Sequence, residues 1–187
     1  MATKKITLPL KKALAELELG DKKKTDKAFQ TIAKSGNVLV LKELLNMLLN
    51  KENAYVNKKI FQLIADISDK AVKEILIDAL NDERFESVRT SLINTVWNSK
   101  IDFSEFIAEF VALSLQGDFM QAIECLTVIE NLAGPFEEHH LLESQLYLKE
   151  YYSDLKKERG QKDEIIGDIA VFIREQNDGI DADLLLE

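Results

Sequence analysis

Residues that cross-link or interrupt a fold are scarce in this 187-residue chain. The single cysteine, Cys125, cannot form an internal disulfide, and two histidines, His139 and His140, are too few for a zinc-finger-like cluster. Two prolines leave long stretches in which a helix need not break. A domain of this size buries roughly 70% of its unfolded surface, so it can fold without disulfides or structural metal.

Long apolar runs are also missing. No stretch of about 18 uncharged apolar residues occurs anywhere, so no membrane span is expected. The first twenty residues are interrupted by Pro9, Lys11 and Lys12 where a signal peptide would be apolar. We therefore expect a cytoplasmic protein that does not associate with a membrane.

Positive charge is in deficit. The chain has 24 Lys and Arg against 33 Asp and Glu, a net charge of -9, which disfavours binding to nucleic-acid phosphates. The charge is uneven, because residues 1–27 hold eight lysines against four acids and residues 163–187 hold eight acids against Arg174 alone. The two ends are either simply solvated or attracted to oppositely charged partners, and the sequence leaves both interpretations open.

What the chain does have is apolar residues spaced three and four apart, with no sustained alternation of the kind seen in strands. This pattern predicts an all-α fold. Five glycines, Gly20, Gly36, Gly117, Gly134 and Gly160, follow such stretches, where a left-handed glycine commonly ends a helix.

About ten helices are expected between these stops. The expected ranges are Leu8 to Leu19, Thr25 to Ser35, Val38 to Leu49, Ala54 to Ile67, two helices within Lys70 to Lys100, Phe103 to Leu115, Phe119 to Ala133, Phe136 to Glu158 and Asp163 to Gln176.

The apolar pattern repeats along the chain. The apolar residues that begin at Leu41 match those that begin at Val72, at a shift of 31 residues. Those that begin at Val56 match those that begin at Val88, at a shift of 32. The pattern from Val72 recurs once more from Ile107, at a shift of 35. A helical pair cannot cover its own apolar face, so neighbouring pairs must stack and share a core.

The repeats suggest how the chain is organised. Residues 1–134 are expected to form four helical hairpins, and residues 135–177 a pair that caps the end of the stack. Residues 178–187 form a short acidic tail. We predict that the whole is a single structural domain, a short α-solenoid of stacked hairpins.

The turn in the middle of the chain carries a family resemblance. Leu80 and Asp82, followed by Val88 and Arg89 and then by the apolar helix containing Leu92, resemble the inter-helix turn of a HEAT-type repeat. The resemblance extends loosely over residues 7–133. It implies a HEAT-like solenoid whose second helices line a concave, protein-binding surface.

The row of apolar residues Phe61, Ile93, Trp97, Val128 and Leu132 lies beside the main apolar stripe of the second helices and keeps the repeat spacing. One interpretation is a partner-binding groove with Trp97 as an anchor. The other is packing between repeats or beneath the C-terminal pair.

Candidate reactive groups are few. On a helix His139 would share a face with Glu143, and His140 with Glu137, but two ligands do not make a metal site. Cys125 lies among apolar residues that would raise the pKa of a thiol rather than activate it. We therefore expect no catalytic residue, no metal and no cofactor.

The combined prediction is a non-catalytic scaffold or adaptor that binds a protein or peptide partner on its second helices. Two alternatives stay open. One is an enzyme on the same scaffold, because some HEAT-like proteins resemble DNA glycosylases or chromophore lyases. The other is a plain helical bundle that serves as a subunit of a larger assembly.

Overall fold

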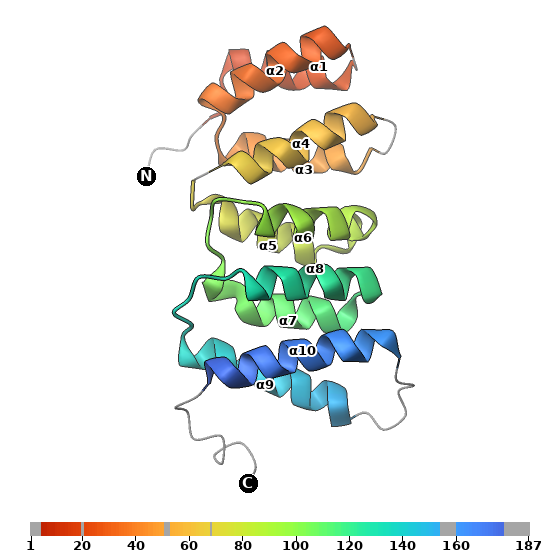
Figure 1. Cartoon of the computed structure of the whole chain (residues 1–187). Helices are drawn as coiled ribbons and strands as arrows, with labels where there is room; N and C mark the ends of the chain where they lie inside the picture. Colours follow the sequence, from red (N-terminus) through yellow and green to blue (C-terminus); the bar gives the residue numbers. More distant parts are fainter. Residues whose placement is uncertain (1–4, 20, 51–52, 68, 154–159, 178–187) are drawn as a thin grey trace. The chain divides into compact units, whose positions relative to one another are not determined.

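The computed structural model describes residues 5–19, 21–50, 53–67, 69–153 and 160–177 (Figure 1). Over these ranges it contains ten α-helices, two 3-10 segments and no strand. The predicted all-α class is therefore confirmed. None of the helices in these ranges is long and apolar enough to cross a membrane.

The chain divides into two compact units, Met1–Ile101 and Asp102–Glu187. The N-terminal unit contains three helical pairs, the last of which includes a 3-10 segment. Its elements are α1 (Leu8–Glu18), α2 (Lys22–Ser35), α3 (Val38–Leu48), α4 (Ala54–Asp66), α5 (Val72–Asn81), η1 (Glu83–Val88) and α6 (Arg89–Trp97).

Helices of the N-terminal unit contact one another in a regular order. Within pairs, α1 packs on α2, α3 on α4 and α5 on α6. Between pairs, α3 packs on α1 and on α5, while α4 packs on α2 and on α6. First helices thus follow first helices and second helices follow second helices, which is how stacked hairpins are arranged.

The apolar stripes recognised in the sequence form these contacts. Leu44 and Leu48 of α3, Ile60 and Ile64 of α4 and Leu80 of α5 are almost fully buried. Burying one such side chain stabilises a fold by about 1.5–3 kcal/mol. Each stripe faces the neighbouring helices, so the repeat in the sequence becomes a repeat of packed pairs.

The C-terminal unit holds two further pairs, and its first helix follows a 3-10 turn. Its elements are η2 (Ser104–Phe106), α7 (Ile107–Gln116), α8 (Phe119–Glu130), α9 (Glu138–Ser153) and α10 (Gln161–Gln176). Here α7 packs on α8 and α9, and α10 packs on α8 and α9. Order between pairs is again first helix on first and second helix on second.

Side chains of Asp and Asn start several helices. The carboxylate of Asp21 accepts a hydrogen bond from Lys24 N at 3.1 Å, and that of Asp118 accepts one from Gln121 N at 2.8 Å. Both satisfy amides that have no partner in the first helical turn. Because Asp21 provides this cap, α2 begins at Lys22, three residues before the predicted start at Thr25.

The predicted left-handed conformation occurs at one described glycine, Gly134, and not at three others, Gly36, Gly117 and Gly160, the last of which has a φ of −149°. Gly134 has a φ of 61°, in the left-handed region. Gly36 and Gly117 instead have φ of −62° and −71° with extended ψ. At Gly36 the reason for glycine is space, because a Cβ there would lie 2.5 Å from the Ile32 carbonyl oxygen. Gly20 lies outside the described residues.

The connection between α8 and α9 is tied back to the start of α7. Ser104 Oγ accepts a hydrogen bond from Gly134 N at 2.9 Å and donates one to Asp102 Oδ1 at 2.6 Å. Asp102 Oδ1 also accepts from Ala133 N at 3.2 Å. Two residues before α7 therefore fix the chain where it leaves α8.

Two predictions about organisation stay predictions. The helix contacts separate the chain after Ile101, whereas the sequence suggested four hairpins in 1–134 and a cap in 135–177. Since each unit is described by itself, a single solenoid of all five pairs stays a hypothesis. The predicted acidic tail, 178–187, lies outside the described residues.

Candidate protein-interaction surfaces

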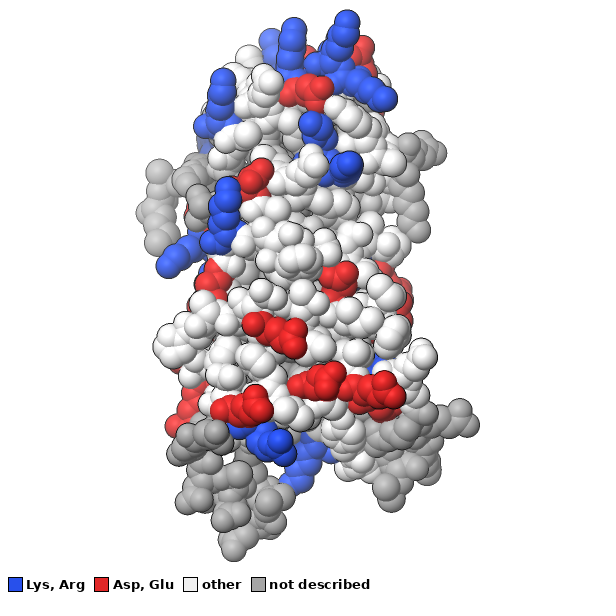
Figure 2. Space-filling view, in the orientation of Figure 1, with Lys and Arg blue, Asp and Glu red and all other residues white. Residues whose placement is uncertain are grey.

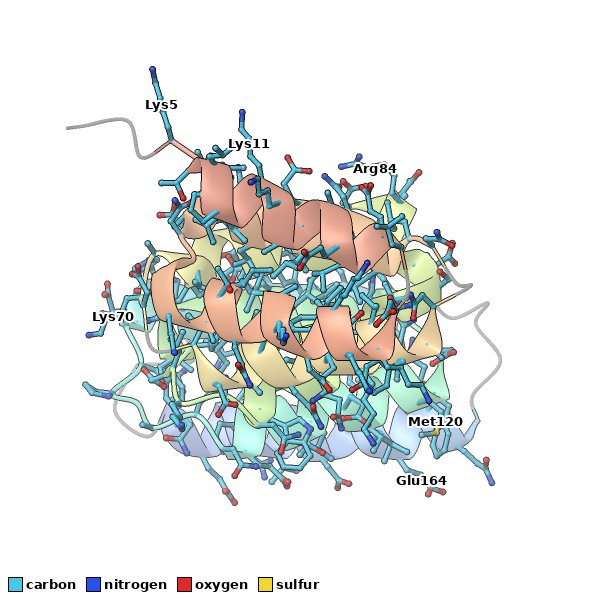
Figure 3. All side chains as sticks on the ribbon, turned by 90° about the horizontal axis from the view of Figure 1, so that it is seen from above. Lys5, Lys11, Lys70, Arg84, Met120 and Glu164 are labelled. Carbon is cyan, nitrogen blue, oxygen red and sulfur yellow. The ribbon has the colours of Figure 1, made fainter. Side chains whose placement is uncertain are left out.

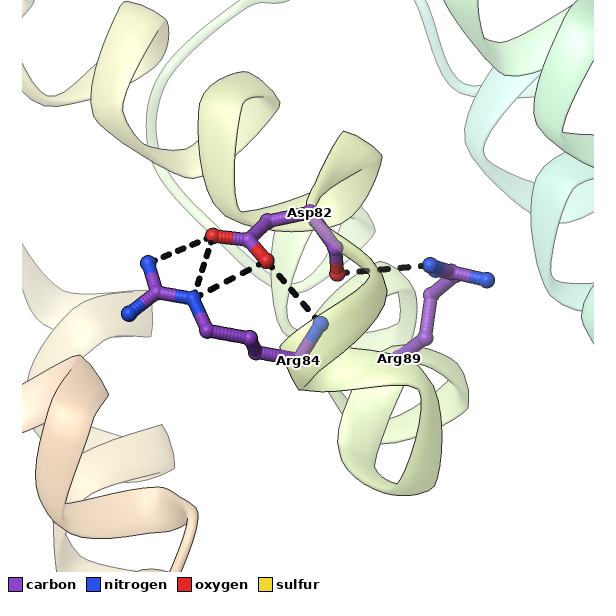
Figure 4. Close-up of polar contacts among 3 residues, drawn as sticks. All are labelled: Asp82, Arg84 and Arg89. Carbon is purple, nitrogen blue, oxygen red and sulfur yellow. Dashed lines mark hydrogen bonds and ion pairs between the residues drawn. The ribbon is translucent and has the colours of Figure 1, made fainter.

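Two arginines near the connection between α5 and α6, Arg84 of η1 and Arg89 at the start of α6, bind different groups (Figure 4). Arg84 pairs with the Asp82 carboxylate at 2.6 Å, and this hydrogen bonding holds the pKa of Asp82 below its usual value. Arg89 turns the other way, and its Nε donates to the Leu80 carbonyl at 2.8 Å. A guanidinium thus neutralises the carbonyl end of α5, where the helix dipole favours a cation.

Side chains of other types donate hydrogen bonds to carbonyl groups at or just after the ends of other first helices. Asn57, at the repeat position of Arg89, donates from Nδ2 to the Asn50 carbonyl at 3.2 Å. In the C-terminal unit Lys162 Nζ donates to the Leu115 carbonyl at 2.7 Å, at the end of α7. Two of the residues that give the turn its family resemblance, Asp82 and Arg89, therefore cap helix ends within the hairpin.

The structure divides the predicted partner-binding row. Ile93 and Val128 are core side chains, 0% and 1% exposed, which a partner does not reach. Trp97, at the end of α6, is 38% exposed, whereas Phe61 and Leu132 are half-buried. Phe61, Ile93 and Trp97 lie in the N-terminal unit, and Val128 and Leu132 lie in the C-terminal unit. Partner binding stays a prediction for the accessible members.

A shallow groove lies between α2 and α4. It has a volume of about 360 Å³ and is lined by Phe29, Gln30, Gln62 and Leu63, among others. Both helices are the second members of their hairpins. The groove therefore lies on the second helices, the side where the sequence predicted partner binding.

A polar network borders this groove and joins the same two helices. Tyr55 of α4 donates its hydroxyl hydrogen to Asp26 Oδ1 of α2 at 2.7 Å, and Lys59 Nζ lies 3.4 Å from the same oxygen. The ammonium groups of Lys22 and Lys59 lie 5.5 and 5.8 Å from the centre of the Tyr55 ring. The hydrogen bond lowers the pKa of Asp26 and raises that of Tyr55.

Lysines concentrate on the outer hairpin of the N-terminal unit (Figures 2 and 3). Residues 5–35 carry eight lysines against four acids. In Figure 3, Lys5 and Lys11 extend away from the ribbon. Exposed side chains opposite the core of this hairpin are Leu8 and Lys12 of α1, Leu19 directly after α1, and Lys23, Lys27 and Lys34 of α2.

The two units differ in charge. Residues 1–101 have 18 basic and 13 acidic side chains, a net charge of +5, whereas residues 102–187 have 6 basic and 20 acidic, a net charge of −14. On the face shown in Figure 2, acidic side chains gather over α8 and α10. The overall net charge of -9 thus conceals a basic unit and an acidic unit.

An acidic cluster with one histidine lies between α7 and α9. Glu109 of α7 faces His140 and Glu143 of α9, and its burial raises the pKa of the Glu109 carboxyl. Glu109 Oε2 and His140 Nδ1 are both shielded from solvent without a hydrogen-bond partner. Tyr147 donates to Glu143 Oε1 at 2.6 Å, so Glu143 is anchored along its own helix.

The histidine pairs suggested by the sequence form differently. His139 Nδ1 lies 3.5 Å from Glu137 Oε2, instead of pairing with Glu143. Across the described residues, no group of three His, Cys, Asp or Glu side chains is arranged to hold a metal ion. Cys125 is buried, as its apolar neighbours predict, and burial raises the pKa of its thiol.

Comparison with known proteins found no matching protein-family model and no significant match among curated proteins or solved structures. The HEAT-like resemblance therefore rests on the sequence pattern of the turn alone.

Proposed function

We propose that this chain is a HEAT-like scaffold that binds a protein or peptide partner on the second helices of its hairpins. The observation that carries the proposal is the sequence of contacts from α2 to α4 to α6. Because consecutive second helices touch, their outward side chains form a continuous surface. It includes the α2/α4 groove and the accessible ring of Trp97.

The chemistry of this surface suits a helix or an extended peptide. Phe29 and Leu63 offer apolar contact in the groove, while Gln30 and Gln62 offer amide donors and acceptors. Exposed aromatic residues such as Trp97 are common anchors of protein interfaces. A partner bound here would contact side chains of two or more hairpins at once.

The test begins with a protein recovered from the native cell by the full-length chain. The dissociation constant of the purified pair is then measured for Trp97→Ala and for Gln62→Arg. A matched control is Phe119→Ala, which removes an aromatic side chain of the same 38% exposure from the C-terminal unit. We expect Trp97→Ala to weaken binding about tenfold or more, as for an aromatic hot spot.

The control should bind like the unaltered chain. A partner whose affinity is the same with Trp97→Ala and Gln62→Arg as with Phe119→Ala would contradict the proposal.

A further inference from the structure

A second pocket adjoins the α2/α4 groove, at the carboxyl ends of these two helices. It has a volume of about 280 Å³ and lies between the ends of α2 and α4 and the starts of α3 and α5. Its described lining residues all belong to the N-terminal unit. Ala33 and Leu63 line both the groove and the pocket, so a peptide segment that lies in the groove reaches the pocket.

The interior of this pocket is apolar. Ile32, Leu41 and Val72 line it and are only 4%, 3% and 3% exposed. Ala33 and Gly36, which have little or no side chain, leave the space between α2 and α3 open. An apolar cavity of roughly 150 Å³ is large enough to bind benzene, so this pocket has room for an aliphatic or aromatic side chain.

Negative charge surrounds the apolar interior. Among the described residues that line the pocket, Asp66 and Asp69 are the charged ones, and both are exposed. The carboxyl ends of α2 and α4 add the partial negative charge of their carbonyl groups. Lys100 Nζ lies 3.4 Å from Asp66 Oδ1, but this pair is exposed and therefore weak, and one ammonium group does not balance two carboxylates.

The amino ends of α3 and α5 also reach the pocket, but side chains already cap them. Asn37 Oδ1 accepts a hydrogen bond from Leu39 N at 3.0 Å, and Asp69 Oδ1 accepts one from Ala71 N at 3.0 Å. An anionic ligand would therefore meet two carboxylates and amides that are already hydrogen-bonded. A ligand that carries a cation beside an apolar group matches both the charge and the interior of the pocket.

We propose that the pocket binds an apolar side chain of the partner, with a lysine or arginine of the same segment against Asp66 and Asp69. This inference rests on the proposed function, because the partner segment enters the pocket from the α2/α4 groove, and it names the chemistry of that partner. An acidic residue or a phosphate beside the apolar group would be repelled by the two carboxylates. An uncharged segment would gain nothing from them.

NMR spectra of the full-length chain, labelled at the methyl groups of Ile, Leu and Val, test the ligand class with two small probes. The probes are 3-methylbutylguanidinium and 4-methylpentanoate, which carry the same branched aliphatic group on a cation and on a carboxylate. We expect the guanidinium to shift the methyl signals of Ile32, Leu63 and Val72 and to bind at least about fivefold more tightly than the carboxylate. Equal affinities, or shifts only at other methyl groups, would overturn the proposal.

Two double variants separate this site from general charge attraction. Asp66→Asn with Asp69→Asn removes both carboxylates, and asparagine can still cap α5. In this variant we expect the two probes to bind within about twofold of each other. Glu74→Gln with Asp78→Asn removes two exposed charges of α5 and should leave the preference for the guanidinium unchanged. The same loss of preference in both double variants would contradict a specific site.

Affinity for the partner distinguishes a failure of this inference from a failure of the proposed function. We expect Asp66→Asn with Asp69→Asn to weaken partner binding about threefold or more, and the control double variant to bind like the unaltered chain. If Trp97→Ala and Gln62→Arg weaken binding and the Asp66 and Asp69 variant does not, this inference is wrong and the proposed function stands. If only the Asp66 and Asp69 variant weakens binding, the pocket binds the partner and the proposed second-helix surface is wrong.

Discussion

Single side chains hold this molecule together mainly by satisfying backbone groups that helices leave open. Arg89, Asn57 and Lys162 each donate to carbonyls at the end of a first helix or in the turn after it. The side-chain oxygens of Ser104 and Asp102 accept hydrogen bonds from the amides of Gly134 and Ala133, which follow α8. Removing such a side chain leaves a buried backbone group without a hydrogen bond. This costs more free energy of unfolding than the net contribution of the hydrogen bond itself.

Ser104→Ala should therefore destabilise the C-terminal unit. The buried hydroxyl accepts from Gly134 N, and its removal leaves that amide without this partner. We expect a loss of about 1–3 kcal/mol in the free energy of unfolding, measured by urea denaturation. Ser153→Ala removes an exposed hydroxyl that donates to the Glu150 carbonyl and should cost less than about 0.5 kcal/mol. Equal effects of the two variants would contradict this account.

Glu109 should make stability depend on pH. Its pKa is raised in the folded state, chiefly by burial and then by Glu143, so the folded chain holds this proton more tightly than the unfolded chain. The stabilisation is complete below the unfolded pKa and is lost as the pH rises through the folded pKa. The nearby charged and titratable groups are His140, Glu143 and Glu105.

The variant Glu109→Gln removes this dependence. We expect its free energy of unfolding to exceed that of the unaltered chain by more at pH 7 than at pH 4. The change in this excess between the two pH values should be below about 1 kcal/mol, because the Glu109 carboxyl is only partly buried and solvent screens it. Glu164→Gln, at an exposed position of α10, is the control. A difference between Glu109→Gln and the unaltered chain that is constant from pH 4 to pH 7 would refute the assignment.

At the scale of elements, the helices pack in pairs, and the turn within a pair is its most specific part. In the hairpin of α5 and α6, Asp82 caps the start of η1 by accepting from Arg84 N at 2.9 Å, while Arg89 caps the end of α5. One turn thus ends one helix and starts the next. Arg84 is exposed and Arg89 is half-buried, so the two side chains should contribute differently to the free energy of unfolding.

Replacing Arg89 by Met should cost about 1.5–3 kcal/mol of unfolding free energy, because a charged donor to the Leu80 carbonyl is lost while the aliphatic stem is kept. Arg84→Met removes an exposed ion pair and the contact of the Arg84 guanidinium with the Phe85 ring, 5.7 Å from the ring centre, and should cost less than about 1 kcal/mol. Chemical denaturation of both variants measures the difference. If Arg84→Met proves the more damaging, the capping role of Arg89 is wrong.

The sequence predicted elements better than contacts between them. Apolar spacing located every helix, because burial of one face fixes the helical period. The hydrogen bond between Asp26 and Tyr55, and the electrostatic influence of His140 on Glu109, were missed because the residues of each pair are about 30 positions apart. The repeat shift of 31 to 35 residues was the available signal, since it brings residues one period apart to neighbouring hairpins.

The predicted binding row shows the limit of periodicity. Repeat spacing correctly placed its members on or just after second helices, but spacing alone does not distinguish a side chain facing a neighbouring helix from one facing water. Ile93 is buried and Trp97, four residues later on the same helix, is accessible. Contacts with neighbouring helices determine which of the two side chains is buried, and the spacing of residues in the sequence does not specify those contacts.

At the scale of the whole molecule, the chain consists of a basic unit of three hairpins and an acidic unit of two. In each unit, the apolar faces of the helices are buried by packing against neighbouring helices, and the opposite faces are exposed to solvent. The proposed scaffold function depends on this linear order within the N-terminal unit. A closed bundle of the same helices would present no continuous row of second helices.

Distances between spin labels on the first helices test that order most directly. Labels replace Lys12 of α1, Lys42 of α3 and Glu74 of α5, all exposed, in pairs within the full-length chain. Packed helices lie about 8–10 Å apart, so we predict that the distance from position 12 to position 74 exceeds that from 12 to 42 by about 10 Å. Equal distances for the two pairs would show α1 beside α5 and contradict the stacked order.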